Sequence, residues 1–309
     1  MVTRGPSGDA AGRVDRTTKP RGERVFENPL LPHKKLTEMY VSMLECRMLE
    51  RRAASLLRGR ARAWRPFAGR EATLIGVAHN LLPQDRVSVA GADPVVRFLR
   101  GEAPGRLLQS LRKSKTKNAQ AVGDAGDGVL PRVDDVTARL AMAAGVALAG
   151  KAAKETVVIA YLDAAETREE WTGAIETAGR LKLPMVFVCQ DAGRATAERR
   201  STLAAKKMRD ADWKRVGAAA ARLRVPVIPV DGQDLIAMYR AAQEAIGRAR
   251  MGIGPTVIWC SQWQLGRLAE AADSLAEFES YLTKRRLFTP QGKRRIAAAF
   301  EKKMRTLKG

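Results

Sequence analysis

The stretch at residues 157–193 constrains the fold of this chain more than any other, and it reads VVIAYLDAAETREEWTGAIETAGRLKLPMVFVCQDAG. An apolar run stops at Asp163, a helical pattern follows, and a second apolar run stops at Gln190 and Asp191. Short apolar runs on both sides of a helix predict a βαβ unit whose two parallel strands are buried on both faces. Ligands of open α/β sheets bind beyond the carboxyl ends of the strands. We therefore expect Asp163 and Asp191 to lie near each other at a ligand-binding edge.

Strand-like and helix-like segments alternate along the rest of the chain. The predicted strands are 86–89, 157–162, 184–189, 225–230 and 255–260. The predicted helices are 36–58, 69–82, 95–101, 105–111, 133–151, 167–180, 213–223, 233–250 and two within 273–308. This alternation predicts a single α/β domain at 34–309, with a mostly parallel, doubly wound sheet and helices on both faces. Residues 1–33 lack periodicity and are rich in Gly, Pro and Arg, so a disordered basic tail is expected there.

The charge balance points to an anionic partner without identifying it. The formal net charge is +22 and the sequence pI is about 10.6. Nucleic acid, phosphorylated ligands or an acidic subunit would fit, and so would a proteome that favours arginine. The charge is spread along the chain, so nucleic acid is not the expected partner. No apolar run approaches the roughly 20 residues of a membrane span and no signal peptide is visible, so no membrane association is expected.

The cysteines favour a reduced compartment. Cys46, Cys189 and Cys260 are far apart and show no zinc-ligand spacing. Cys189 and Cys260 close apolar runs, as buried small side chains do. A cytoplasmic location is therefore expected.

Five segments, in this order, resemble one known family. They are MYVSMLECRMLERRAASLL, FAGREATLIGVAHNLLPQDRV, AMAAGVALAGKAA, GRLKLPMVFVCQDAG and DSLAEFESYLTKRRLFTPQ. On these segments the chain is similar to the alpha subunit of the thiamine-diphosphate-dependent, decarboxylating component of 2-oxo acid dehydrogenases (pyruvate, branched-chain and acetoin types). The resemblance covers about residues 36–303.

The resemblance implies a thiamine-diphosphate-binding fold, and thiamine diphosphate with Mg²⁺ as cofactors. It also implies a beta-type partner subunit in an α2β2 assembly, with a lipoyl acyltransferase as a further partner; self-association is the alternative. In the family, a Gly-Asp-Gly motif and a later Asn-Asn pair hold the magnesium ion that bridges to the diphosphate.

This motif is eroded here. The resemblance places Asp163 and Ala164 on the Gly-Asp-Gly motif and Thr167 on its downstream Asn. Asp191 and Ala192 fall on the Asn-Asn pair, so the amide ligand is missing. The metal candidates are therefore Asp163 and Asp191.

Arginines offer a second way to hold the diphosphate. Arg194 falls on the family's metal-binding tyrosine, and Arg168 follows Thr167. These two side chains could contact an anion in place of the metal. The cofactor candidates are thus Asp163, Ala164, Thr167, Arg168 and Arg194.

No catalytic residue is assigned. The family's Arg-Asp-His loop corresponds to Ala92-Asp93-Pro94, which has lost the histidine. Three functions follow from these observations. The favoured one is a degenerate paralogue of the alpha subunit that pairs with a beta-type subunit and has weak or no catalysis. The alternatives are active oxidative decarboxylation of a 2-oxo acid with acyl transfer to a lipoyl group, and a basic scaffold for an acidic partner or nucleic acid.

Overall fold

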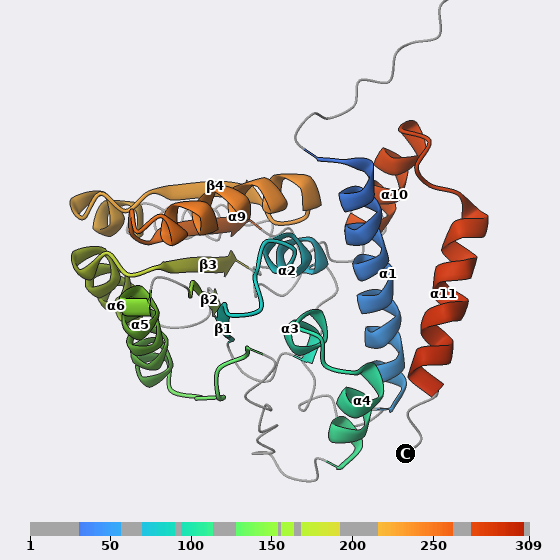
Figure 1. Ribbon diagram of the computed structural model, residues 1–309, viewed down its shortest axis with the longest axis horizontal. Helices are drawn as coiled ribbons and strands as arrows, with labels where there is room; N and C mark the ends of the chain where they lie inside the picture. The colour runs from blue at the N-terminus through green and yellow to red at the C-terminus, as the bar shows by residue number, and fades with distance from the viewer. Residues whose placement is uncertain are drawn as a thin grey trace, which may run out of the picture. The chain divides into compact units, whose positions relative to one another are not determined.

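A parallel sheet forms the centre of the unit His33–Gly309 (Figure 1). The computed structural model describes residues 31–56, 70–89, 94–113, 128–153, 156–163, 168–191, 216–261 and 273–305. Five strands lie in this part of the chain, in the order β1-β2-β3-β5-β4, and every pair is parallel. They are β1 (Arg86–Ser88), β2 (Val158–Asp163), β3 (Met185–Asp191), β4 (Val227–Asp231) and β5 (Thr256–Ser261). The prediction of a doubly wound parallel sheet is confirmed.

The helices lie close to their predicted positions. They are α1 (His33–Leu56), α2 (Glu71–Ala78), α3 (Pro94–Leu99), α4 (Pro104–Lys113), α5 (Val136–Ala153), α6 (Arg168–Leu181), α9 (Leu235–Arg250), α10 (Ser274–Lys284) and α11 (Pro290–Arg305). A further helical segment occupies residues 216–222. Aspartate side chains fix two of the starts, because they accept hydrogen bonds from first-turn N–H groups. Asp234 caps α9 and Asp273 caps α10.

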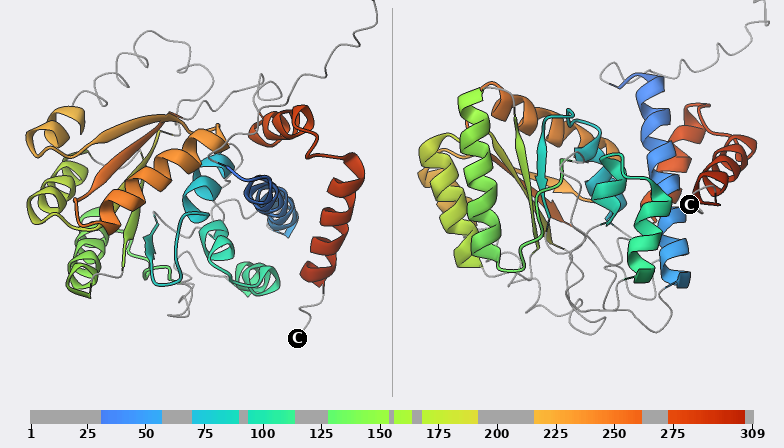
Figure 2. Two further views of the ribbon diagram at one scale, coloured as in Figure 1. Left: turned by 45° about the horizontal axis from the view of Figure 1, so that its top comes forward. Right: turned by 60° about the horizontal axis from the view of Figure 1, so that its bottom comes forward.

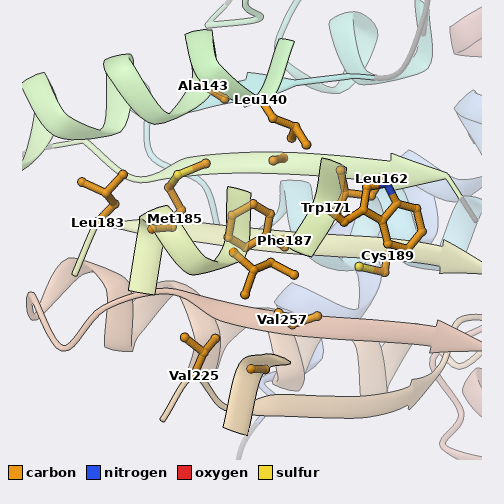
Figure 3. Close-up of a cluster of buried hydrophobic side chains, with 14 of the residues drawn as sticks. Leu140, Ala143, Leu162, Trp171, Leu183, Met185, Phe187, Cys189, Val225 and Val257 are labelled. Atoms are coloured by element: carbon orange, nitrogen blue, oxygen red, sulfur yellow. The ribbon is translucent and has the colours of Figure 1, made fainter. Parts of the chain in front are cut away.

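One face of the sheet carries a core cluster that α5 and α6 cover (Figures 2 and 3). Alternate side chains point to this face because successive residues of a strand point to opposite sides. They include Leu162 of β2 and Phe187 and Cys189 of β3. Trp171 from the first turns of α6 closes the cluster at the carboxyl end of the strands, and its ring meets Trp259 edge-on with centroids 6.5 Å apart.

Helices α2 and α9 cover the opposite face and cross each other closely. The crossing depends on Gly76, where an added Cβ would lie 2.8 Å from the Met238 Cβ and 2.9 Å from the Tyr239 backbone nitrogen. Real Cβ atoms do not approach that closely, so a side chain at Gly76 would push the two helices apart. The Thr73 hydroxyl adds a hydrogen bond of 2.9 Å to the Gly232 carbonyl after β4.

Helix α5 covers the sheet with one side and leaves another side open. Leu140, Ala143 and Ala147 are buried against the sheet, whereas Leu148 is 51 % exposed. Among the described helices, α5 is the one whose length and composition would suffice to cross a membrane. The apolar side of α5 packs against β1, β2 and α6, as expected for a helix that covers one face of a sheet.

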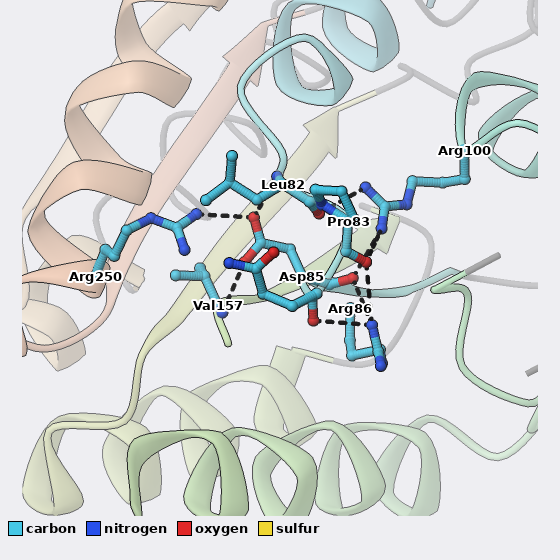
Figure 4. A network of polar contacts seen from close by, with 8 residues as sticks. Leu82, Pro83, Asp85, Arg86, Arg100, Val157 and Arg250 are labelled. Carbon is cyan, nitrogen blue, oxygen red and sulfur yellow. Dashed lines mark hydrogen bonds and ion pairs between the residues drawn. The ribbon is translucent and has the colours of Figure 1, made fainter. Parts of the chain in front are cut away.

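A buried carboxylate ties the amino ends of the strands together (Figure 4). The Asp85 side chain is fully buried and accepts hydrogen bonds from the Leu82 and Val157 backbone N–H groups, at 2.7 and 3.0 Å. Arg250, at the end of α9, pairs with the same carboxylate at 2.8 Å. Arg100 donates to the carbonyls of Leu82, Pro83 and Asp85. Asp85 thus joins the segments that precede β1 and β2 to α9.

Candidate cofactor site at the carboxyl edge

The carboxyl ends of the strands bring several polar positions to one edge of the sheet. Asp163 ends β2 and is the register partner of Gln190 on β3. Asp191 is the next residue of β3 and pairs with Ser261 of β5, which in turn pairs with Asp231 of β4. The backbones of Asp163 and Asp191 therefore end neighbouring strands at the same edge, one register step apart. Ala164, Thr167 and Arg194 lie outside the described residues, and Arg168 begins α6.

A buried amide–guanidinium contact lies at this edge, and sequence reasoning missed it. Gln190 and Arg70 are both 4 % exposed. The Gln190 Oε1 atom accepts a hydrogen bond of 3.0 Å from Arg70 Nε and a second one from Nη2. Because the oxygen faces the guanidinium, the Gln190 Nε2 atom points elsewhere, and it is buried with no hydrogen-bond partner within the described residues. Arg70 is the residue that precedes α2, so this contact joins α2 to the end of β3.

A second buried contact holds three helices together. The Arg47 guanidinium of α1 lies 2.7 Å from Glu71 of α2 and binds Asp273, before α10, with two hydrogen bonds of 2.9 and 3.0 Å. Burial on its own lowers the pKa of Arg47, but the hydrogen bond to Asp273 and the charge of Glu71 outweigh it and raise the pKa. The Arg47 hydrogen bond lowers the pKa of Asp273 in return. Arg47 and Asp273 therefore stay ionised near neutral pH.

His79, at the end of α2, supplies no acid or base to this edge. Its Nε2 atom lies 2.8 Å from the Ser42 hydroxyl of α1, and its carbonyl accepts a hydrogen bond from Lys35. Burial, together with the nearby Lys35 charge, lowers the pKa of His79 to about 4. The ring is neutral at pH 7 and serves contacts between α1 and α2, in agreement with the structural role expected from the sequence.

The cysteines do not provide a nucleophile. All three are free and buried, and burial raises the pKa of Cys260 to about 12. The thiol is therefore protonated at neutral pH, and reactive cysteines need the thiolate. The expectation that Cys189 and Cys260 are buried side chains is confirmed.

The donor set of the described residues does not fit a magnesium ion. Mg²⁺ requires an octahedron of oxygen ligands. No group of three or more Asp, Glu, His or Cys side chains with metal-ligand geometry occurs among the residues that the structure describes. The amide oxygen of Gln190 is already bound to the Arg70 guanidinium, and a guanidinium repels a second cation. Among the described residues, the contact therefore adds a positive charge at the end of β3.

Comparisons with known proteins identify the family. A model of the "Dehydrogenase E1 component" family matches residues 40–301. The pyruvate dehydrogenase E1 component subunit alpha of Acholeplasma laidlawii is 30% identical over 241 residues, covering 77% of this chain and 67% of the relative. The corresponding Staphylococcus aureus subunit (strain Mu50) is 28% identical, covering 82% of this chain and 66% of the relative. This chain thus spans about two thirds of the length of these relatives.

Two further proteins are similar over most of this chain. The alpha subunit of the acetoin:2,6-dichlorophenolindophenol oxidoreductase of Bacillus subtilis is 28% identical, covering 76% of this chain and 71% of the relative. A transketolase structure from Pichia stipitis superposes with a TM-score of 0.46 at 14% identity, covering 86% of this chain and 47% of that chain. The match to the family model over most of the chain, with the alpha-subunit relatives, confirms the resemblance seen in the sequence: this chain belongs to the dehydrogenase E1 component family, on its alpha-subunit side.

Proposed function

We propose that this chain is a degenerate paralogue of the E1 alpha subunit, which keeps the fold and the subunit pairing and has weak or no catalysis. The buried contact between Gln190 and Arg70 supports this proposal, because it brings a guanidinium to the residue before Asp191, which the resemblance aligns with the family's Asn-Asn pair. Ala192, two residues further on, has no side-chain oxygen at all. Fold persists more readily than site chemistry.

The cofactor residues retain one feature of the family and lose the others. Asp163 keeps the carboxylate at the end of β2. Ala164, Thr167 and Ala192 stand where the family has glycine, asparagine and asparagine. Two arrangements for a bound diphosphate follow. Arg168 and Arg194 would contact its oxygens directly, or Asp163 and Asp191 would share a loosely held metal ion. The buried guanidinium at this edge favours the first.

The open side of α5 supports pairing with a beta-type subunit in an α2β2 assembly. Leu148 is 51 % exposed, and a Cβ added at Gly145 would meet nothing within 4 Å. An exposed glycine inside a helix lowers the stability of the helix by about 1 kcal/mol relative to alanine. A partner backbone that approaches the helix closely at this position would explain why a glycine stands there. Self-association would use the same side. The proposed location is the cytoplasm, and a lipoyl acyltransferase would join the complex only if acyl transfer persists.

Calorimetry with thiamine diphosphate and Mg²⁺ tests the proposal. The titration is run on this chain alone and on its complex with a co-expressed beta-type subunit, because in this family cofactor sites lie between subunits. We expect no heat of binding at millimolar cofactor in either sample, with the complex still forming. Tight, magnesium-dependent binding by the complex would overturn the proposal and favour the active enzyme. A titration with pyrophosphate in EDTA then separates the two arrangements, since only the arginine one binds without metal.

A further inference from the structure

The C-terminal helices carry the densest positive charge of the described residues. Residues 284–305 contain nine basic side chains and one acidic one, Glu301. The basic side chains are Lys284, Arg285, Arg286, Lys293, Arg294, Arg295, Lys302, Lys303 and Arg305. They come from the end of α10, the turn that follows and α11, which lies at the rim of the molecule alongside α1 (Figure 1).

The fold sorts the α11 cations into two groups. Inward cations meet carboxylates of other helices: Lys293 pairs with Glu279 of α10 at 2.7 Å, and Lys303 with Glu45 of α1 at 3.5 Å. Phe300 on the same inward side is 1 % exposed and meets the Phe98 ring of α3 edge-on. These contacts hold α11 in one orientation, so its outward side is a fixed surface.

The outward group includes two arginines that pair with no carboxylate of the described residues. Arg294 and Arg295 are exposed, and no carboxylate of the described residues pairs with either. Further along, the Arg305 side chain is 81% exposed and reaches only Glu301, of its own helix, at 3.5 Å. Between the two ends lies a hollow of about 280 Å³ lined by Ala298, Glu301, Lys302 and Arg305. The methyl group of Ala298 leaves room for a partner to approach the helix closely.

We propose that this outward surface, defined by Arg294, Arg295, Lys302 and Arg305, binds the phosphate backbone of duplex DNA without regard to sequence. At 3.6 residues per turn these side chains fall on one side of α11. With a rise of 1.5 Å per residue, the first two cations stand about 10–16 Å from the last two. The major groove of B-DNA is about 12 Å wide, so the two clusters match phosphates on its opposite rims.

The same surface is poorly suited to other polyanions. A membrane-surface helix needs bulky apolar side chains beside its cations, whereas the outward side of α11 offers only alanine methyl groups. Single-stranded nucleic acid is held by stacking on aromatic side chains, and the aromatic residue of α11, Phe300, is buried. With a membrane surface and single-stranded nucleic acid disfavoured, contact between a rigid helix and the phosphates of a duplex is the better fit. Such contacts give affinity for DNA that does not depend on the base sequence.

Fluorescence anisotropy with a labelled random-sequence DNA duplex of 24 base pairs tests the proposal on the full chain at several salt concentrations. The test variant replaces Arg294, Arg295, Lys302 and Arg305 with Gln. The control variant removes the same charge from exposed positions elsewhere: Arg180, Arg222, Arg224 and Arg240, also to Gln. All substituted side chains are exposed, and thermal melts would be used to check that both variants fold.

We expect the test variant to bind at least tenfold more weakly at low salt, and its slope of log K against log salt to be shallower by about three to four. The control variant should keep affinity within about threefold and the same slope. Equal losses in both variants would overturn the proposal, because net charge alone would then explain binding. Absence of duplex binding by the wild type, with or without binding to poly-glutamate, would also overturn it. If the test variant does not fold, the double variant Arg294→Gln/Arg295→Gln is used, with half the change in slope expected.

Discussion

At the residue scale, the Arg47 guanidinium forms ion pairs with two carboxylates from different parts of the chain. The guanidinium satisfies Glu71, whose side chain is fully buried, and Asp273, which caps α10. Removing one partner of a buried pair leaves an uncompensated charge. None of this was predictable from the sequence, because the three residues are separated by 24 and 202 positions and each alone looks like an ordinary charged side chain.

Replacing Arg47 should destabilise the fold strongly. We expect Arg47→Met to lower the free energy of unfolding by about 3–5 kcal/mol, since the buried Glu71 would lose its ion pair with Arg47. Urea unfolding followed by circular dichroism measures the change. Arg51→Met on the same helix is the control; Arg51 is exposed, and its replacement should cost less than about 0.5 kcal/mol. Similar losses for both variants would show that the contact does not stabilise the fold.

His79 should make stability depend on pH below neutrality. Burial lowers its pKa in the folded chain to about 4, from the ordinary histidine value of 6.5. As the pH falls from 6.5 toward 4, the unfolded chain takes up a proton that the folded chain does not. The free energy of unfolding therefore drops, by at most about 1.4 kcal/mol per pH unit and by less where water screens the half-buried ring.

Thermal melts between pH 7 and 4.5 test this dependence. We expect Tm to fall less steeply with pH for His79→Gln than for the wild type, because glutamine does not titrate. Lys35 and Glu38, whose charges act on the His79 ring, are present in both proteins. Parallel Tm profiles for the two proteins would mean that His79 is not the source of the dependence.

At the element scale, the sequence predicted nearly every strand and helix that the structure describes. Apolar runs that stop at carboxylates marked β2, β3 and β4 within two residues, and helical spacing marked α1 and α9. The length of α2 was overestimated: the helix ends at Ala78 rather than near position 82. The Asn80 side-chain amide donates hydrogen bonds to the carbonyls of Gly76 and Tyr239 just after the helix ends. The bond to Tyr239 is a tertiary contact with α9, which the spacing of residues in the sequence cannot predict.

The crossing of α2 and α9 should not tolerate a side chain at Gly76. We expect Gly76→Ala to cost about 1–3 kcal/mol of unfolding free energy, because the new Cβ would meet Met238 at 2.8 Å. Chemical denaturation measures it. Gly145→Ala is the matched control: it also adds a methyl group to a helix, but into open space. That change should be neutral or stabilising by up to about 1 kcal/mol in the isolated chain. A stabilising effect at Gly76 would contradict the close crossing.

At the scale of the whole molecule, sequence comparison located the candidate edge but not its chemistry. The ends of β2 and β3 lie together as expected, since neighbouring parallel strands end at one edge. The contact between Arg70 and Gln190 joins positions 120 residues apart and could be seen only after folding. The net charge of +22 likewise did not locate a binding surface, whereas the helical spacing of α11 brings Arg294, Arg295, Lys302 and Arg305 to one side of that helix.

The open side of α5 should be needed for pairing with another subunit but not for the stability of the isolated chain. We expect Leu148→Glu to leave the Tm of the isolated chain within about 2 °C, because Leu148 is 51 % exposed, and to abolish co-purification with a beta-type subunit. Light scattering after size-exclusion chromatography measures the assembly. Met251→Glu is the control, since Met251 is 71 % exposed on another part of the unit. Retention of the complex by Leu148→Glu would exclude this side of α5 as the interface.

The Asp85 network has a consequence for how this chain can change over evolutionary time. Its hydrogen bonds join the segments that precede β1 and β2 to the end of α9, so these elements are held together at the amino edge of the sheet. Asp163 and Asp191, the candidate metal positions, end β2 and β3 at the opposite edge. Because the Asp85 contacts and the candidate site lie at opposite ends of the same strands, substitutions at the carboxyl edge can accumulate in a lineage without breaking the contacts that hold the amino edge together.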